Sequence, residues 1–232
     1  MITPRVLVLW DIDHTLLQSR GMGREMYERA LPLVFGRPFA ELAEVSGRTE
    51  LDIIAETLVL HGIEPTTEHV DRLARALTAS YEAGREELAE RGRVLPGARE
   101  ALTSLAEEPA VRQGVLTGNL RAVARVKLRV FALDQYVDLE CSAYGDDHRD
   151  RAELVDIARA RAAERVGAEF TGLRTVLIGD TPRDVEAARA AGARVIAVAG
   201  GQSDLDELRK AGADDVLADL RDLPTVRRLL LA

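Results

Sequence analysis

Apolar positions along the chain form two kinds of pattern. Short, largely apolar runs, typical of strands buried on both faces of a sheet, occur at 6–10, 114–117, 175–178 and 194–198, with shorter candidates at 139–142 and 215–217. Segments with helical spacing lie between them, at 97–107, 120–132, 151–166, 183–191 and 203–211. Strands that alternate with helices predict an α/β fold with a doubly wound parallel sheet.

The region after the first strand departs from this alternation. Helical spacing covers three stretches, each with a glycine near its end: 22–36, 50–61 and 67–91. No convincing strand falls between Leu17 and Arg93. We therefore expect an inserted helical domain at 18–94 and an α/β core domain at 1–17 and 95–232.

Composition narrows the class of protein. A net charge of -8 over 232 residues argues against a general nucleic-acid binder. No apolar run is long enough to span a bilayer, and the start of the chain lacks the pattern of a signal peptide. Cys141 is the single cysteine, which excludes an intrachain disulfide and a cysteine-based metal site. We expect a cytoplasmic protein.

Two carboxylates follow the first strand. Asp11 and Asp13 are one residue apart, and the two-residue period of a strand would send both side chains the same way. Burying two unpaired carboxylates side by side is costly. The pair therefore indicates a bound cation, acid–base chemistry, or both.

Further polar residues follow two other strands. Thr117 and Asn119 end the strand at 114–117, and Asp180 with Asp184 follows the strand at 175–178. Ligands of open parallel sheets bind at the carboxyl ends of the strands. Four carboxylates there would repel one another unless a cation held them, and Mg²⁺ takes oxygen ligands together with substrate phosphate. The pattern predicts a phosphate held by Mg²⁺.

These segments also carry a family resemblance that spans essentially the whole chain. Residues 11–16, 116–119 and 178–184 resemble motifs one, two and four of the haloacid dehalogenase-like hydrolase superfamily. The helical insertion resembles the cap domain of its phosphoglycolate phosphatase-like branch. The resemblance implies an enzyme, a Mg²⁺-dependent phosphomonoester hydrolase that acts on a small phosphorylated metabolite through an aspartyl-phosphate.

The resemblance also implies residue roles. Asp11 would be the nucleophile, and Asp13 the general acid and then the general base. Phosphoryl oxygens would be held by Thr117, Gly118 and Asn119. The metal would be held by Asp11, the backbone carbonyl of Asp13, Asp180 and Asp184.

Two positions depart from the family pattern. His14 stands where the family usually has glycine, either as a tolerated turn residue or as a phosphate contact. The lysine of motif three is absent as such, and Arg151, Arg149 and Lys127 are its candidate replacements. Lys127 lies roughly 12 Å along its helix from the strand end, which counts against it. Only two of the 31 basic residues are lysines, and Lys127 is one of them. Because arginine is the usual basic residue in this chain, an arginine is weak evidence for a special role, and a lysine is slightly stronger evidence.

In the cap, residues 46–50 resemble a loop that faces the active site of related phosphatases, and Arg48 would bind a substrate carboxylate or second phosphate. A phosphomutase of the same fold stays open. Asp13 argues against a 2-haloacid dehalogenase, whose pattern lacks the second aspartate. A cap without lysine excludes phosphonoacetaldehyde hydrolysis by a Schiff base. We expect neither a nucleic-acid nor a membrane partner, and the sequence leaves monomer or homodimer open.

Overall fold

A five-stranded parallel sheet forms the centre of the α/β part of the protein in a computed structural model, which describes residues 4–201 and 203–231. The strand order is β4 (Val111–Val115), β1 (Val6–Trp10), β5 (Thr175–Gly179), β6 (Arg194–Val198) and β7 (Asp215–Leu217). All neighbouring strands run parallel. The α/β fold class predicted from the sequence is confirmed.

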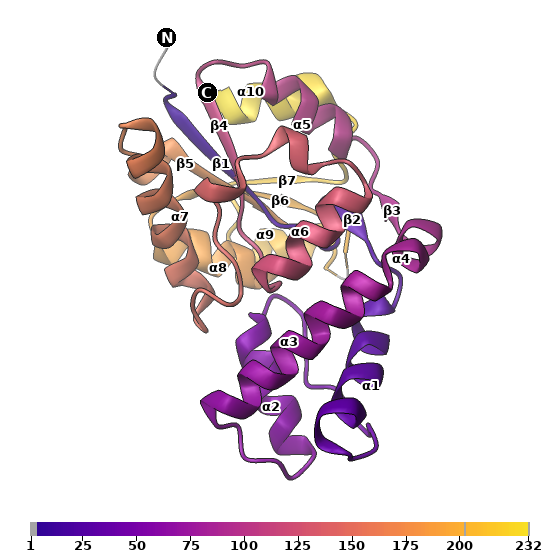
Figure 1. Cartoon of the computed structure of the whole chain (residues 1–232). Helices are drawn as coiled ribbons and strands as arrows, with labels where there is room; N and C mark the ends of the chain where they lie inside the picture. The colour runs from indigo at the N-terminus through magenta and orange to yellow at the C-terminus, as the bar shows by residue number, and fades with distance from the viewer. Residues whose placement is uncertain (1–3, 202, 232) are drawn as a thin grey trace.

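Helices cover both faces of the sheet (Figure 1). One face packs against α5 (Ala98–Ala106), α6 (Arg121–Val130) and α10 (Leu223–Leu231). The other packs against α7 (Arg151–Val166), α8 (Pro182–Ala190) and α9 (Leu205–Ala211). Side chains of β1 alternate between the two cores, because successive residues of a strand point to opposite faces: Val8 and Trp10 enter the first, Leu7 and Leu9 the second.

Four further helices form a layer beside the sheet (Figure 1). They are α1 (Met22–Phe35), α2 (Glu50–Leu60), α3 (Thr67–Ala83) and α4 (Arg85–Arg91), and they share an apolar core that also includes Leu120, Val123 and Val126 at the start of and along α6. We call this layer the cap and the rest of the molecule the core. The domain boundaries at 18–94 stay a prediction.

The chain passes between core and cap through a short antiparallel ribbon. Its strands are β2 (Leu17–Gln18) and β3 (Arg93–Val94), which pair with each other and not with the central sheet. The sequence pattern did not indicate this ribbon, because two-residue strands are too short to show a period. The two segments that connect the core to the cap therefore lie side by side.

Three predicted elements need correction. The strand expected at 114–117 is β4, which begins earlier, at Val111. Its polar Gln113 hid the pattern, yet this side chain is buried and accepts a hydrogen bond from Trp10 Nε1 at 3.0 Å. The strand expected at 139–142 is instead a 3₁₀ turn, η2 (Leu139–Cys141). The long helix expected at 67–91 breaks at Gly84 into α3 and α4.

Within the described residues, we find no helix with the length and apolar character needed to cross a membrane. The cytoplasmic location expected from the sequence stays a prediction.

His14 lies in the tight loop after β1 with a φ of 62°, the left-handed region that favours glycine. Its backbone N–H donates to the carbonyl of Leu17 at 2.8 Å, and its carbonyl lies so close to Gly200 that a Cβ there would collide with it. The departure from the family's glycine thus falls at a position where backbone conformation, rather than side-chain chemistry, accounts for the family preference.

We predict that His14→Gly is more stable than His14→Ala by about 1 kcal/mol, because only the glycine relieves the left-handed strain. Both variants lose the imidazole, so the comparison isolates the backbone. Chemical denaturation of the two variants measures the difference. Equal stability, or a more stable alanine variant, would contradict the assignment of strain to this residue.

Candidate active site

The site lies where three parallel strands end. Asp11 directly follows β1, Thr117 comes two residues after β4, and Asp180 directly follows β5. β1 runs toward the cap, so this edge of the sheet faces the cap helices (Figure 1). The structure brings together the residues that the sequence placed at strand ends.

A cluster of three buried carboxylates occupies one side of the site. Asp11, Asp180 and Asp184 are at most 7% exposed, and each places a carboxylate oxygen within 4.8 Å of the others. Arg151 lies against them, with Nη2 2.6 Å from Asp184 Oδ1 and 3.2 Å from Asp11 Oδ1. One buried cation therefore faces three buried anions.

This excess of negative charge contributes to raised pKa values of Asp11 and Asp180. Burial raises the pKa of Asp11 to about 7, with Arg151 opposing and Asp184 and Asp13 adding to the rise. Burial, with repulsion from Asp11 and Asp184, raises the pKa of Asp180 to about 9. Without a further cation, the cluster would hold protons near neutral pH.

Asp184 is the most fully bonded of the three. Its Oδ2 accepts hydrogen bonds from the backbone N–H and the hydroxyl of Thr181, at 3.1 Å and 2.7 Å, which form part of a capping box that starts α8. Its Oδ1 accepts from Arg151. Asp180, in contrast, accepts only a long hydrogen bond of 3.4 Å from Thr15 among the described residues. Asp11 and Asp180 thus keep more free acceptor capacity for a cation than Asp184 does.

The other side of the site is organised around Lys127. Its Nζ donates to Asp13 Oδ2 at 2.6 Å and to Asn119 Oδ1 at 2.7 Å. The Asn119 amide donates in turn to the same Asp13 oxygen at 2.7 Å and to the Thr117 hydroxyl at 2.8 Å. These four residues form one network that holds the Asp13 carboxylate.

Lys127 shapes the charge of Asp13. Burial alone would raise the pKa of Asp13, but the charge and hydrogen bond of Lys127, together with Asn119, hold it below its ordinary value. The distance of Lys127 along its helix counted against a role in the site, but its long side chain runs back toward the strand end. Lys127 is buried there, with 3% of the residue exposed.

Other residues singled out from the sequence lie at the edge of the site. Arg149 is exposed. The Arg48 guanidinium pairs within the cap, with Asp52 at 2.7 Å and with Glu56. The backbone of this segment docks on the core: the Glu50 N–H donates to the carbonyl of Gly118 at 2.7 Å, and a Cβ on Gly118 would collide with the carbonyl of Arg48.

Sequence reasoning missed several residues of the site. Thr15 contacts Asp180, and Gly201 passes so close to Asp180 that any Cβ would collide with its carboxylate. The paired glycines after β6 were a readable signal for such a close approach. Two cap residues, Tyr27 and Tyr81, carried no signal because a tyrosine in a helix is ordinary, and Glu50 was singled out only as part of the cap segment 46–50.

A cavity of about 920 Å³ opens beside Arg151. It is lined mainly by the cap segment 46–49 and by core segments 149–152 and 181–183. Asp11 and Asp13 do not line it, so it borders the carboxylate cluster through Arg151 and Thr181.

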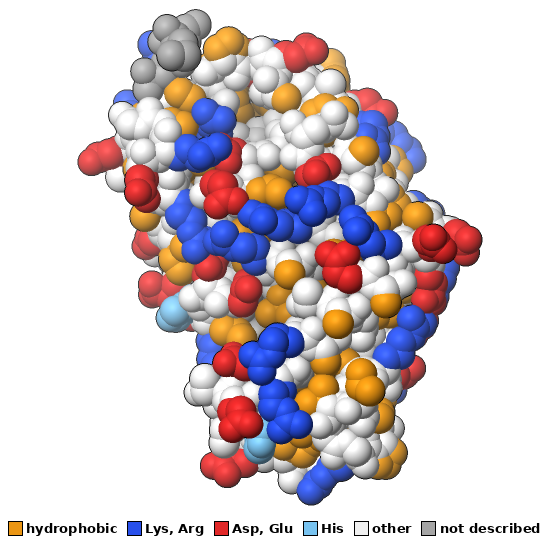
Figure 2. Space-filling model, viewed as in Figure 1, with side chains coloured by type: hydrophobic (Ala, Val, Ile, Leu, Met, Phe, Trp, Pro, Cys, Tyr) orange, Lys and Arg blue, Asp and Glu red, His pale blue; other side chains and the backbone are white. Residues whose placement is uncertain are grey.

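The surface beside the site bears a band of basic side chains over α6 and α7 (Figure 2). Four of its arginines pair with acidic side chains nearby, Arg121 and Arg125 with Glu140, Arg161 with Asp147, and Arg165 with Asp138. Their charges are therefore largely balanced, which gives no support to a nucleic-acid surface.

A model of haloacid dehalogenase-like hydrolases matches residues 6–192. The chain belongs to this family. A phosphoglycolate phosphatase of Cupriavidus necator is 27% identical over 96% of this chain and 93% of its own. A candidate pyrophosphatase, PpaX, of Caldanaerobacter subterraneus subsp. tengcongensis is 28% identical over 54% of each chain, so the match spans about half the length of that relative.

Solved structures share the fold. A hydrolase from Pseudomonas syringae superimposes with a TM-score of 0.69 at 24% identity, over 95% of this chain and 96% of its own. A candidate β-phosphoglucomutase from Bacteroides vulgatus gives 0.66 at 20% identity, over 99% and 92%. This haloacid dehalogenase-like hydrolase is thus an enzyme with phosphatase-named relatives, and the resemblance stated from its motifs is confirmed.

The donors present fit a hard divalent cation. All three clustered side chains offer carboxylate oxygens, the ligands that Mg²⁺ prefers, and the described residues bring no histidine or cysteine into this cluster. The raised pKa values of Asp11 and Asp180 indicate crowded negative charge, which a bound cation would neutralise.

The same charges predict how stability depends on pH. Carboxyls with raised pKa values stabilise the fold at low pH, and this stabilisation is lost as pH rises through about 7 for Asp11 and about 9 for Asp180. We predict that the melting temperature of the metal-free protein falls between about pH 5 and 9, and that Mg²⁺ raises it more at the upper end, since fewer protons compete there.

Differential scanning fluorimetry with EDTA or Mg²⁺ across this range measures both effects. Asp180→Asn is the control, because it removes the most strongly shifted carboxyl and should flatten the pH dependence. A Mg²⁺ effect that is larger at low pH would contradict the prediction.

Proposed function

We propose that this protein is a Mg²⁺-dependent phosphomonoester hydrolase of a small phosphorylated metabolite, working through an aspartyl-phosphate on Asp11. The observation that carries the proposal is the separation of the two aspartates of the first motif. Asp11 lies against Arg151 in the carboxylate cluster, whereas Asp13 is held by Lys127 and Asn119. Two neighbouring carboxylates in different surroundings suit two different roles.

In the first step, a carboxylate oxygen of Asp11 attacks phosphorus, and the bond from phosphorus to the ester oxygen breaks. Because Lys127 keeps the free Asp13 carboxyl ionised, Asp13 takes up a proton brought by the phosphate monoester monoanion as it binds, and it passes this proton to the departing alcohol oxygen. In the second step, water attacks the phosphorus of the aspartyl-phosphate and gives a proton to Asp13. The bond from phosphorus to Asp11 then breaks and releases phosphate.

The remaining residues bind and orient. The Thr117 hydroxyl and the Asn119 amide, beside Asp13, would hold phosphoryl oxygens together with the backbone at Gly118. Asp11, Asp180 and Asp184, with the Asp13 carbonyl, would hold Mg²⁺. When bound, the cation neutralises charge on the carboxylates and the phosphoryl group. Arg151 keeps Asp11 and Asp184 in place through its planar guanidinium.

Support for a phosphoglycolate-like substrate comes from the sequence resemblance and from the name of the Cupriavidus necator relative. The predicted contact of Arg48 with a substrate carboxylate or phosphate stays a prediction. Its guanidinium already pairs with Asp52 and Glu56, so a ligand would have to displace one of them.

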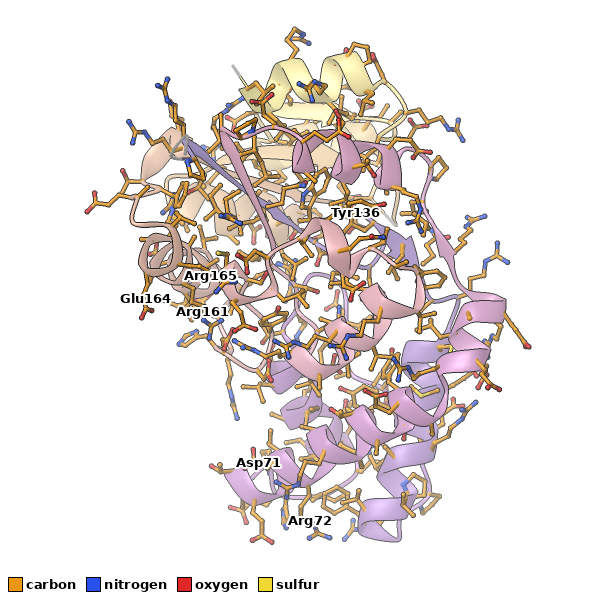
Figure 3. All side chains as sticks on the ribbon, turned by 45° about the horizontal axis from the view of Figure 1, so that its top comes forward. Asp71, Arg72, Tyr136, Arg161, Glu164 and Arg165 are labelled. Atoms are coloured by element: carbon orange, nitrogen blue, oxygen red, sulfur yellow. The ribbon has the colours of Figure 1, made fainter. Side chains whose placement is uncertain are left out.

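We predict that Asp11→Asn abolishes phosphate release from p-nitrophenyl phosphate in the presence of Mg²⁺, because the amide cannot act as the nucleophile. Asp71→Asn is the matched control, since Asp71 is exposed at the end of the cap remote from the sheet (Figure 3). Malachite green detection of phosphate, with and without EDTA, measures the outcome.

Full activity of Asp11→Asn, or equal activity without Mg²⁺, would refute the corresponding part of the proposal. Conversion of a hexose 1-phosphate to its 6-phosphate, without free phosphate, would instead identify a phosphomutase. Release of halide from a 2-haloacid would identify a dehalogenase.

Both buried cations are expected to be needed. We predict that Lys127→Ala and Arg151→Ala each lower kcat/KM by about 10²–10³-fold, because each leaves a functional carboxylate misplaced and its charge uncompensated. Arg149→Ala is the control, since its side chain is exposed. Steady-state kinetics with p-nitrophenyl phosphate measures the three variants. If neither buried cation matters, the assignment of both as replacements for the motif-three lysine fails.

A further inference from the structure

The cap brings one carboxylate of its own to the side of the site that holds Asp13. Glu50 is the first residue of α2, and its backbone N–H donates to the carbonyl of Gly118 at 2.7 Å. Gly118 directly precedes Asn119, whose amide holds Asp13. This contact fixes the start of α2 over the Asp13 network.

Two cap tyrosines surround the same place. The Tyr27 hydroxyl donates to Glu50 Oε1 at 2.5 Å. Lys127 Nζ lies 5.3 Å from the ring centroid of Tyr81, a cap residue with 6% of its surface exposed. Cap and core therefore meet in one polar group of residues: Tyr27, Glu50 and Tyr81 from the cap, and Asp13, Asn119 and Lys127 from the core.

Glu50 makes no direct ion pair in this group, although the charge of Lys127 acts on it from nearby. Among the described residues, no lysine or arginine forms an ion pair with it. The ammonium of Lys127 lies nearby but donates its hydrogen bonds to Asp13 and Asn119. A half-buried carboxylate without a counter-ion is unusual, because desolvating a charge is costly unless an opposite charge compensates it.

One oxygen of Glu50 remains available. Oε1 accepts from Tyr27, whereas Oε2 accepts no hydrogen bond from the described residues and is not among their buried unpaired atoms. Solvent, or a ligand, can therefore reach Oε2. Asp13 is also partly accessible, since 30% of its side chain is exposed. Burial raises the pKa of Glu50 although the hydrogen bond from Tyr27 and the charge of Lys127 oppose the rise, and a positively charged ligand would offset the remaining cost.

Resting on the proposed hydrolase function, we propose that the substrate is the phosphate ester of a small amino alcohol, whose ammonium group is bound by Glu50. In the proposed reaction, Asp13 protonates the departing alcohol oxygen, so the alcohol lies on the Asp13 side, where Glu50 is placed. An ammonium there gains a charge-assisted hydrogen bond. A carboxylate in the same place, as in phosphoglycolate, would face the like charge of Glu50.

Three esters of similar size test this inference on the intact protein with Mg²⁺: phosphoethanolamine, 2-hydroxyethyl phosphate and phosphoglycolate. They differ chiefly in the group at the far end of the alcohol, which is cationic, neutral or anionic. We expect kcat/KM for phosphoethanolamine to exceed that for phosphoglycolate by about 10- to 100-fold, the range of one hydrogen bond to a charged group.

Glu50→Gln keeps an oxygen for the Tyr27 hydroxyl but removes the charge, and it should lower this preference at least about tenfold. Glu68→Gln is the matched control, because Glu68 is exposed on α3. It should leave the preference unchanged.

Preference of the wild type for phosphoglycolate or 2-hydroxyethyl phosphate, while p-nitrophenyl phosphate is still hydrolysed, overturns the amino-alcohol inference and leaves the hydrolase proposal standing. A preference for phosphoethanolamine that Glu50→Gln does not change overturns the role of Glu50. Failure to hydrolyse any of the four esters overturns the hydrolase proposal and this inference with it.

Discussion

Electrostatic crowding at the carboxyl end of the sheet is the constraint on which the rest of the site depends. Asp11, Asp180 and Asp184 are buried close together, and among the described residues a single buried arginine pairs with them. Such a cluster is unstable as three charges and needs protons or a cation. The tight loop at His14, the close approach of Gly201 and the capping box at Thr181 all hold backbone and side chains around this unfavourable arrangement.

Two buried cations lie on opposite sides of the site, and we propose that together they replace the lysine of the third family motif. Arg151 spans Asp11 and Asp184 on the side of the carboxylate cluster, where a planar guanidinium can contact two carboxylates. Lys127 serves Asp13 and Asn119 on the opposite side, where a single point charge on a flexible stem is enough. The two aspartates of the first motif are thereby kept in separate electrostatic surroundings although they are neighbours in sequence.

The sequence predicted the sheet, the helices and the strand-end carboxylates well, because short continuous apolar runs such as 175–178 and 194–198, bounded by polar residues, are typical of strands in a buried parallel sheet. It failed where polar residues are buried with partners from distant segments. Gln113 hid the start of β4 because its hydrogen bond to Trp10 spans two strands. Tyr81 gave no sequence signal, and Glu50 was included only as part of the segment 46–50, since only the docking of the cap brings them near Asp13 and Lys127.

The contact between the cap segment 48–50 and Gly118 is made by backbone atoms. Glu50 donates through its N–H, Gly118 accepts through its carbonyl, and no side chain fits between Gly118 and Arg48. Apart from Thr49, whose hydroxyl donates to the carbonyl of Arg149 at 2.7 Å, the side chains of this segment can therefore be exchanged without breaking this backbone contact. Sequence changes in this cap segment can then alter which alcohol is accepted, while the residues of the core that carry out phosphoryl transfer stay the same.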